Sequence, residues 1–128
     1  IIFATKLTSL KHHLARYALG DLGLDTFNYN GHATTSDALW SGLPVITKIG
    51  KSYPARVSAS LLTSLGLKEL ITTNVEEYEE KAFYLASNPE KLIHLKSKLN
   101  KLRKTSTLYN SELFTKNLED KFREIYLK

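Results

Sequence analysis

The residues whose types could support chemistry are most concentrated between Gly31 and Asp37, in the run Gly-His-Ala-Thr-Thr-Ser-Asp. A polar loop runs here into a short helix that we expect at residues 35–41. Gly31 lets the backbone approach a ligand closely, and the free N–H groups at a helix N-terminus carry about half a positive charge, which favours a phosphate. Thr34 and Thr35 can cap the helix or donate to phosphate oxygens. Asp37 lies one turn further on, where a carboxylate can accept hydrogen bonds from ribose, so the segment predicts a site for a phosphate joined to a sugar.

His32 lies in the middle of this loop, and two interpretations of it stay open. It is either a surface histidine without a role or a member of the phosphate-binding turn. As a general base it would need a partner that orients the ring. No neighbour in the sequence identifies such a partner.

A second group of candidates precedes the loop, on a helix that we expect at residues 10–19. His13 and Arg16 are three residues apart and therefore share one face of that helix. A flat imidazole can stack on a base, and a guanidinium can donate to the base or to a phosphate. The alternatives are a solvated helix face and a metal pair that includes His12. We discount the metal because no carboxylate stands at a suitable spacing.

Other conspicuous residues have structural interpretations. Arg56 follows Lys48 and Lys51, and either binds an anionic ligand or pairs with a carboxylate, of which we favour the ion pair. Trp40 stands beside Leu39 and is expected in the core. The chain has no P-loop, no Gly-x-Gly-x-x-Gly run and no nucleophile elbow, so NTPase, dehydrogenase and hydrolase functions have no motif support.

The composition narrows the class of protein. The 128 residues are enough for one domain with a core, and 42% apolar with 24% charged residues is ordinary for a soluble globular protein. No apolar run approaches the roughly 20 residues of a membrane span. Cysteine is absent, which excludes disulfides and thiolate metal sites. The net charge is +5, but Lys and Glu are interspersed from Glu69 onward as on solvated helix faces, so a small anionic ligand is favoured over nucleic acid.

The order of apolar segments predicts how these candidates are positioned. Short apolar runs predict strands at residues 1–4, 22–24, 43–47 and 70–71, and helical spacing appears at residues 10–19, 35–41 and 55–65. This alternation predicts a doubly wound α/β domain with a parallel sheet.

Beyond about residue 74 only helices are expected. One runs to about residue 86 and the next from Pro89 to about residue 104, and the last follows Asn110 or Ser111. Asn74 with Glu77 predicts a capped start for the first of them, and Ser52 predicts a cap for the helix at 55–65. We therefore expect one domain over residues 1–128, with a helical tail at about 74–128. The chain lacks methionine and opens on an apolar run, which predicts a fragment of a longer protein.

Several of these segments together are similar to a known family. They are Ile2-Phe3-Ala4, His13-Leu14-Ala15-Arg16, Leu24-Asp25-Thr26, Asn30-Gly31-His32, Asp37-Ala38-Leu39-Trp40, Gly42-Leu43-Pro44-Val45 and Arg56-Val57. In order and spacing they closely resemble the carboxyl-terminal part of the catalytic region of O-linked N-acetylglucosamine transferases and their bacterial SPINDLY-like relatives. The resemblance is distinctive over residues 1–71 and looser through the tail.

The resemblance implies the donor-binding, Rossmann-like carboxyl-terminal half of a cytoplasmic GT-B glycosyltransferase. It implies that Gly31, His32, Ala33 and Thr34 surround the donor pyrophosphate, and that Asp37 holds the ribose. His13 would pack on the base with Arg16 beside it. The implied reaction transfers N-acetylglucosamine from UDP-GlcNAc to protein Ser or Thr hydroxyls with inversion, without a metal or other cofactor.

The family's acceptor-side groups and its tetratricopeptide repeats would lie upstream, so the catalytic base is not identified and residues 1–128 alone are expected to be inactive. Two departures from the family pattern stand out. Leu10 occupies a position where the family commonly has Lys, and Ala33 one where it usually has Thr. Three alternatives stay open: another donor such as GDP-fucose, a non-protein acceptor, and a non-catalytic nucleotide-sugar-binding or scaffold module.

Overall fold

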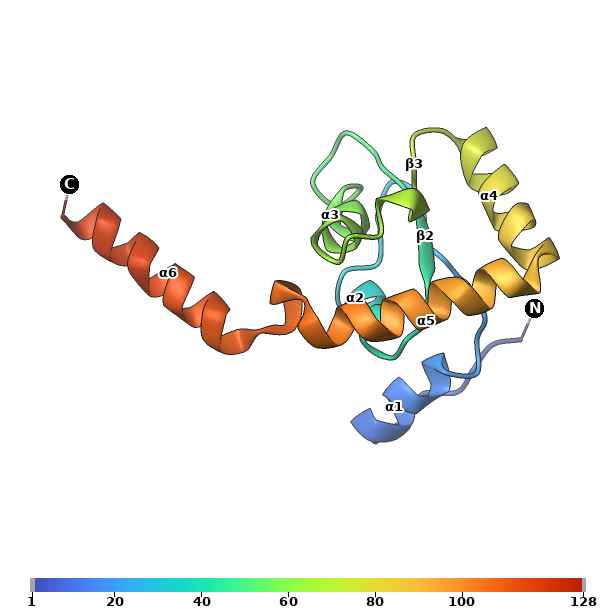
Figure 1. Cartoon of the computed structure of the whole chain (residues 1–128), viewed down its shortest axis with the longest axis horizontal. Helices are drawn as coiled ribbons and strands as arrows, with labels where there is room; N and C mark the ends of the chain where they lie inside the picture. The colour runs from blue at the N-terminus through green and yellow to red at the C-terminus, as the bar shows by residue number, and fades with distance from the viewer. Residues whose placement is uncertain (1, 128) are drawn as a thin grey trace.

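Three short parallel strands form a sheet in the order β1–β2–β3. The computed structural model describes residues 2–127. The strands are β1 (Gly23–Leu24), β2 (Val45–Lys48) and β3 (Ile71–Thr72). Strands β2 and β3 lie between helices α3 (Val57–Ser64) and α4 (Val75–Ser87) (Figure 1). Gly23 is in register with Val45, and Thr47 with Ile71. The expected parallel sheet is confirmed for these three strands, whose ends differ from the predicted ones by at most two residues.

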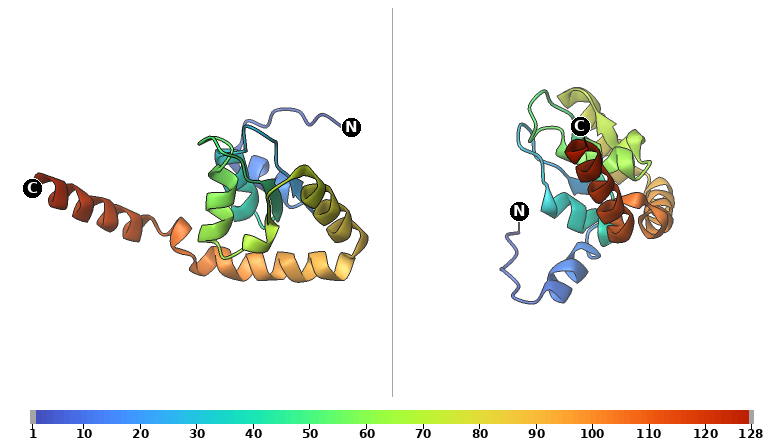
Figure 2. Two further views of the ribbon diagram at one scale, coloured as in Figure 1. Left: turned by 90° about the horizontal axis from the view of Figure 1, so that it is seen from above. Right: turned by 90° about the vertical axis from the view of Figure 1, so that its left-hand side faces the viewer.

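Helices connect and cover the strands. Among them, α1 (Leu10–Tyr17) precedes β1, α2 (Ala33–Trp40) leads to β2, and α3 (Val57–Ser64) with the short 3₁₀ helix η1 (Lys68–Leu70) leads to β3. Helices α3 and α4 (Val75–Ser87) lie on opposite sides of the sheet (Figures 1 and 2). This is the α/β architecture that the alternation of segments predicts.

The predicted helical tail divides into two parts with different surroundings. Helix α4 and helix α5 (Pro89–Thr105) pack on the sheet domain, and α5 contributes buried leucines from one face. After the 3₁₀ turn η2 (Thr107–Tyr109), helix α6 (Ser111–Tyr126) extends away from the domain (Figures 1 and 2). Its apolar residues are mostly exposed, among them Phe114, Leu118, Phe122, Ile125 and Tyr126.

The strand predicted at residues 1–4 is wrong for the residues that the structure describes, and Ile1 lies outside them. Residues 2–7 have no regular structure, and Ile2 and Phe3 are 96% and 91% exposed. A strand forms only when a neighbour accepts its backbone hydrogen bonds, and this segment runs apart from β1 (Figure 2). Local hydrophobicity therefore predicted a strand that has no partner here.

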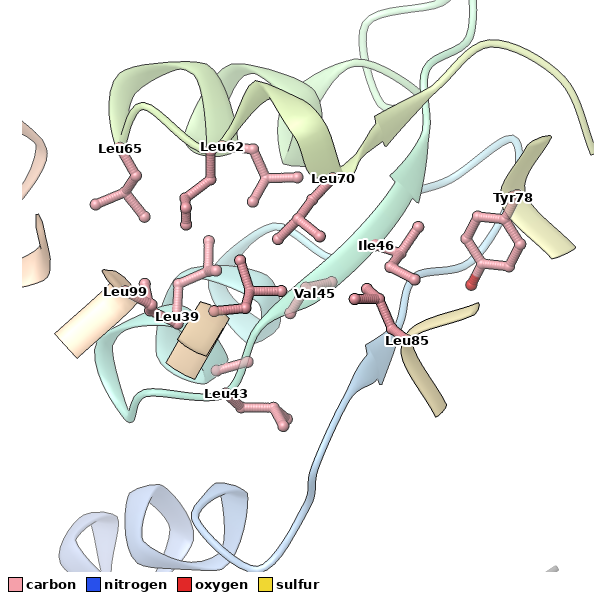
Figure 3. Close-up of a cluster of buried hydrophobic side chains, with 13 residues drawn as sticks. Leu39, Leu43, Val45, Ile46, Leu62, Leu65, Leu70, Tyr78, Leu85 and Leu99 are labelled. Carbon is pink, nitrogen blue, oxygen red and sulfur yellow. The ribbon is translucent and has the colours of Figure 1, made fainter. Parts of the chain in front are cut away.

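The core lies between β2 and the helices around it (Figure 3). Leu39, Ile46, Leu62 and Leu99 are fully buried and come from α2, β2, α3 and α5. The expectation that Trp40 is a core residue is wrong, because its side chain is 46% exposed. Successive helical residues point about 100° apart, so with Leu39 facing the core Trp40 turns outward. Its ring lies 4.9 Å from that of Tyr109, between centroids.

The helix cap predicted at Asn74 forms, whereas the one predicted at Ser52 does not. Asn74 accepts a hydrogen bond from the N–H of Glu77 at 2.8 Å, so the predicted cap of α4 is confirmed. The Glu77 carboxylate in turn accepts from the N–H of Thr73 at 2.8 Å. Ser52 does not cap α3, which begins five residues later. Instead its carbonyl accepts from the N–H of Ala55 within a turn.

Candidate functional site

The loop between β1 and α2 is held in place by side chains beneath it. Asp25 follows β1 directly, and its Oδ1 accepts the Gly31 N–H at 2.7 Å. Its Oδ2 accepts the hydroxyl of Thr47, in β2, at 2.6 Å. From the first turn of α3, Ser58 donates to the Gly31 carbonyl at 2.9 Å. The N–H and the carbonyl of Gly31 are therefore held by two side chains, Asp25 after β1 and Ser58 in α3, and Thr47 in β2 supports Asp25.

Helix α2 begins at Ala33, two residues earlier than expected. Its first intrahelical hydrogen bond runs from the Ser36 N–H to the His32 carbonyl at 3.0 Å. The N–H groups of residues 33–35 precede that bond and point out of the helix end, where an anion can accept from them. A Cβ on Gly31 would lie 2.7 Å from Thr34 Oγ1 and closer still to Thr35 Oγ1, so glycine is required for this close approach.

The two threonines of this turn have different surroundings. Thr35 is buried, and its hydroxyl oxygen lies 3.0 Å from Ser58 Oγ. Thr34 is exposed, so its hydroxyl is the one that can reach a ligand. The sequence alone did not distinguish the two, since both have a hydroxyl in the first helical turn.

His32 is packed between two tyrosines. Its ring stacks on Tyr29, with 5.0 Å between ring centroids and 13° between planes, and meets Tyr53 edge-on at 6.0 Å. Its Nε2 is buried without a hydrogen-bond partner among residues 2–127. The ring therefore has the orienting contacts that the sequence did not reveal, because Tyr53 arrives from the loop before α3.

The second group of predicted residues meets the first across the gap between α1 and α2. His13 Nε2 lies 3.8 Å from Asp37 Oδ2, and Arg16 Nη2 lies 3.3 Å from His13 Nδ1. A guanidinium can only donate, so Nδ1 accepts and the ring hydrogen sits on Nε2, toward Asp37. His12 is exposed and belongs to neither contact. The structure thus brings His13, Arg16 and Asp37 together, as the sequence-based hypothesis requires.

Tyr17 completes this side of the site. It packs edge-on against His13, with 5.3 Å between ring centroids. Burial, and secondly the negative charge of Asp37, raise the pKa of the Tyr17 hydroxyl, while Arg16 opposes them. The phenol is therefore neutral at pH 7 and can serve as a hydrogen-bond donor or acceptor beside the carboxylate.

A cavity of about 210 Å³ lies beside the start of α2. Its lining includes Asp25 and Thr26 after β1, Gly31 and Thr34 at the start of α2, and Tyr17 from α1, the neighbour of His13. It extends along β1 to the residues at the carboxyl end of that strand, where open parallel sheets bind ligands.

Arg56 lies apart from this cavity. It lines a separate hollow of about 720 Å³ along the outer face of α3. Within the described part of the chain it forms no ion pair with a carboxylate, contrary to the interpretation that we favoured from the sequence.

Residues 2–127 contain no cluster of three or more His, Cys, Asp or Glu side chains arranged to hold a metal ion. None of their helices is both long and apolar enough to cross a membrane.

Comparisons with known proteins agree with the resemblance. A probable UDP-N-acetylglucosamine–peptide N-acetylglucosaminyltransferase SPINDLY from Petunia hybrida is 39% identical over 121 residues, which is 94% of this chain. A protein with the same activity in its name, SEC from Arabidopsis thaliana, is 39% identical over 127 residues, or 98% of this chain. The chain spans 13% of the length of each of these two relatives.

A solved structure supports the fold independently. A mutant O-GlcNAc transferase from Thermobaculum terrenum superposes with a TM-score of 0.86 and 34% identity, over 93% of this chain and 23% of that one. The model of glycosyl transferase family 41 matches residues 1–118. The match covers almost all of the chain, including both halves of the candidate site, and the chain therefore belongs to glycosyl transferase family 41.

Proposed function

We propose that this chain is the donor-binding part of an enzyme that transfers N-acetylglucosamine from UDP-GlcNAc to Ser or Thr hydroxyls of proteins, with inversion at the anomeric carbon. The names of the relatives support the donor and acceptor classes. One observation carries the proposal. The open N-terminus of α2 and Tyr17 line one cavity, and Tyr17 packs against His13, which in turn lies beside Arg16 and Asp37.

The geometry suggests a place for each part of the donor. The backbone N–H groups after Gly31, together with the Thr34 hydroxyl, donate to the pyrophosphate, and His32 stands beside them. Asp37 accepts from the ribose hydroxyls. The His13 ring packs on the base, with Arg16 donating beside it. In the reaction the diphosphate departs with added negative charge, and fixed N–H donors at a helix end stabilise that charge without reorganising.

The two departures from the family pattern are compatible with these roles. Ala33 lacks a hydroxyl but keeps its backbone N–H at the helix end, where the phosphate contact is made. Leu10 lies on α1 and is 68% exposed. Its side chain has neither the positive charge nor the hydrogen-bond donors of a lysine. We expect weaker electrostatic attraction for the nucleotide there than a lysine would provide.

The catalytic base and the acceptor-binding groups come from the part of the relatives that this chain does not span, so residues 1–128 alone are inactive. The donor diphosphate is held by N–H groups and basic side chains, without a metal ion. We place the enzyme in the cytoplasm, where nucleotide sugars are available to protein acceptors.

Calorimetry of the full-length protein with UDP tests the site. We expect binding, and we expect Asp37→Asn to weaken it about 10- to 100-fold, the usual loss when hydrogen bonds to a charged group are removed. Asp21→Asn is the matched control, because the Asp21 carboxylate is exposed and pairs with Lys96 instead. Absence of UDP binding, or equal binding by wild type and Asp37→Asn, would contradict the proposal.

The donor and the acceptor need a second assay. The full-length enzyme is incubated with UDP-GlcNAc or GDP-fucose and a mixture of peptides that contain Ser and Thr. The masses of the peptides are then measured by mass spectrometry. The expected product carries the mass of one N-acetylhexosamine. A deoxyhexose instead would identify the fucosyl alternative. UDP binding without any transfer would favour the non-catalytic module.

A further inference from the structure

Two buried side chains at the candidate site hold the backbone of Gly31, one at its N–H and the other at its carbonyl. Asp25 accepts its N–H at 2.7 Å, and Ser58 donates to its carbonyl at 2.9 Å. Ser58 is fully buried and Asp25 is 8% exposed, so most of their surface is turned away from a ligand. We propose that Asp25 and Ser58 are positioning residues, which aim the N–H groups at the start of α2 at the donor diphosphate. The proposal rests on the function proposed above.

Asp25 is suited to this role because it is anchored to the sheet. An ionised carboxylate only accepts hydrogen bonds. One of its oxygens is used by the Thr47 hydroxyl at 2.6 Å, and the Asp25 carbonyl accepts from Tyr78 Oη at 3.0 Å. These contacts tie Asp25 to β2 and α4. Its remaining oxygen is left to fix the position of the Gly31 N–H relative to the core.

Ser58 acts from the other side through a short chain of hydroxyls. A hydroxyl has one hydrogen, and when Ser58 donates it to the Gly31 carbonyl its oxygen can accept from Thr35, whose Oγ1 lies 3.0 Å away. Thr35 is then turned inward and its own hydroxyl is satisfied. The loop before the helix and the first turn of the helix are in this way held to the same side chain of α3.

The consequence is preorganisation of the anion-binding end of α2. Gly31 stands only two residues before Ala33, so rotation about its backbone dihedral angles would change the direction of the following N–H groups. Holding it before the ligand arrives lowers the ordering cost of binding. The base and the ribose are contacted by His13, Arg16 and Asp37, and the body of α2 is held separately by Leu39 in the core. Loss of the two supports should therefore weaken phosphate binding selectively.

The test compares two ligands on the full-length protein. UDP is titrated by calorimetry, and uridine, which lacks the phosphates, is followed by ligand-observed NMR. Asp25→Asn and Ser58→Ala are each expected to weaken UDP about tenfold. Uridine affinity is expected to stay within about twofold of wild type. A purely structural role would lower both affinities together.

A matched control exists in the same network. Thr72 donates its hydroxyl to the Thr47 carbonyl at 3.1 Å and is as buried as Ser58, but it does not contact the Gly31 loop. Thr72→Val removes the same kind of hydrogen bond as Ser58→Ala, and we expect it to leave the affinity for UDP unchanged. If Asp25→Asn fails to fold, Ser58→Ala carries the test, since it removes a single oxygen atom.

The outcomes separate the two proposals. Wild-type protein that does not bind UDP would refute the proposed function. Wild-type binding that persists unchanged in Asp25→Asn and Ser58→Ala would refute the positioning role alone. Equal losses of affinity for UDP and for uridine would also refute it. So would a loss of UDP affinity in Thr72→Val as large as that in Ser58→Ala, because either result indicates general damage to the fold.

Discussion

Replacing Gly31 by Ala is the smallest change that should disable the phosphate-binding turn. The added Cβ would lie within 3.0 Å of two hydroxyl oxygens, those of Thr34 and Thr35, a separation that real Cβ atoms essentially never show. The backbone of Gly31 is not itself in the left-handed region, so alanine can adopt its dihedral angles. The whole effect therefore comes from the collision.

The size of the effect depends on which threonine can move. Thr34 is exposed and can rotate its hydroxyl away. Thr35 is 4% exposed and its hydroxyl contacts the fully buried Ser58, so relief there requires a shift of α2 or α3. Such overpacking typically costs about 1–3 kcal/mol. We expect Gly31→Ala to lower the free energy of unfolding of this domain by that amount, and to weaken UDP binding at least tenfold because the helix end moves.

Hydrogen exchange of the intact protein, read by mass spectrometry over the β1–α2 segment, measures the local loss of stability. Calorimetry with UDP measures the loss of binding. Gly20→Ala is the matched control, since its Cβ would lie 3.3 Å from the flexible Leu43 side chain and at an ordinary contact distance of 3.5 Å from the Tyr17 carbonyl. A compatible glycine-to-alanine change is neutral or stabilises by about 0.4–1 kcal/mol.

A double-mutant cycle identifies the colliding group. Thr35→Ala removes the nearest oxygen and costs stability by itself, because Ser58 loses a hydrogen-bond partner. The double variant Gly31→Ala, Thr35→Ala should be less destabilised than the sum of the single variants, by about 1 kcal/mol or more. Strict additivity, or a Gly31→Ala protein with wild-type exchange and UDP affinity, would refute the reasoning.

Three further predictions concern the fold that supports the site. Burial, and secondly the charge of Asp25, raise the pKa of Tyr78 to about 12, above its usual value of 10.0, so the unfolded chain loses this proton first. Stability should therefore fall by about 2–3 kcal/mol between pH 10 and pH 12, and Tyr78→Phe should reduce that slope in pH-dependent denaturation. Asn74→Ala should lower the free energy of unfolding by about 1 kcal/mol and speed amide exchange in the first turn of α4. Unchanged exchange would show that Asn74 does not stabilise the start of this helix. Leu99→Ala should cost about 2–5 kcal/mol in thermal unfolding, and a loss below 1 kcal/mol would show that α5 is not part of the core.

Local sequence patterns determined much of the secondary structure, because the relevant contacts are local. The leucines at residues 92, 95 and 99 repeat at helical spacing, and α5 buries all three. The cap of α4 involves residues three apart in the chain. The same is true of the loop and helix that contain Gly31 and Asp37, since a glycine, hydroxyl residues and a carboxylate around a helix start are adjacent in sequence. Their roles toward a donor stay predictions that the binding experiments test.

Tertiary structure alone decided the properties that depend on distant residues. The segment at the N-terminus is as apolar as a strand, but no described neighbour accepts its hydrogen bonds. Helix α6 has an apolar face like that of α5, yet it extends away from the core (Figure 1). Trp40 is a large apolar residue of the kind that is usually buried, but helical geometry turns it outward.

The candidate site shows the same division. Its chemistry follows from residue types that the sequence displays, but its rigidity comes from contacts of Asp25, Ser58 and Tyr53 that form only once the chain is folded. Ser58 lies 27 positions after Gly31, and Tyr53 lies 21 after His32. No periodicity or motif links residues so far apart. Their contacts arise because parallel strands place successive loops at one edge of the sheet.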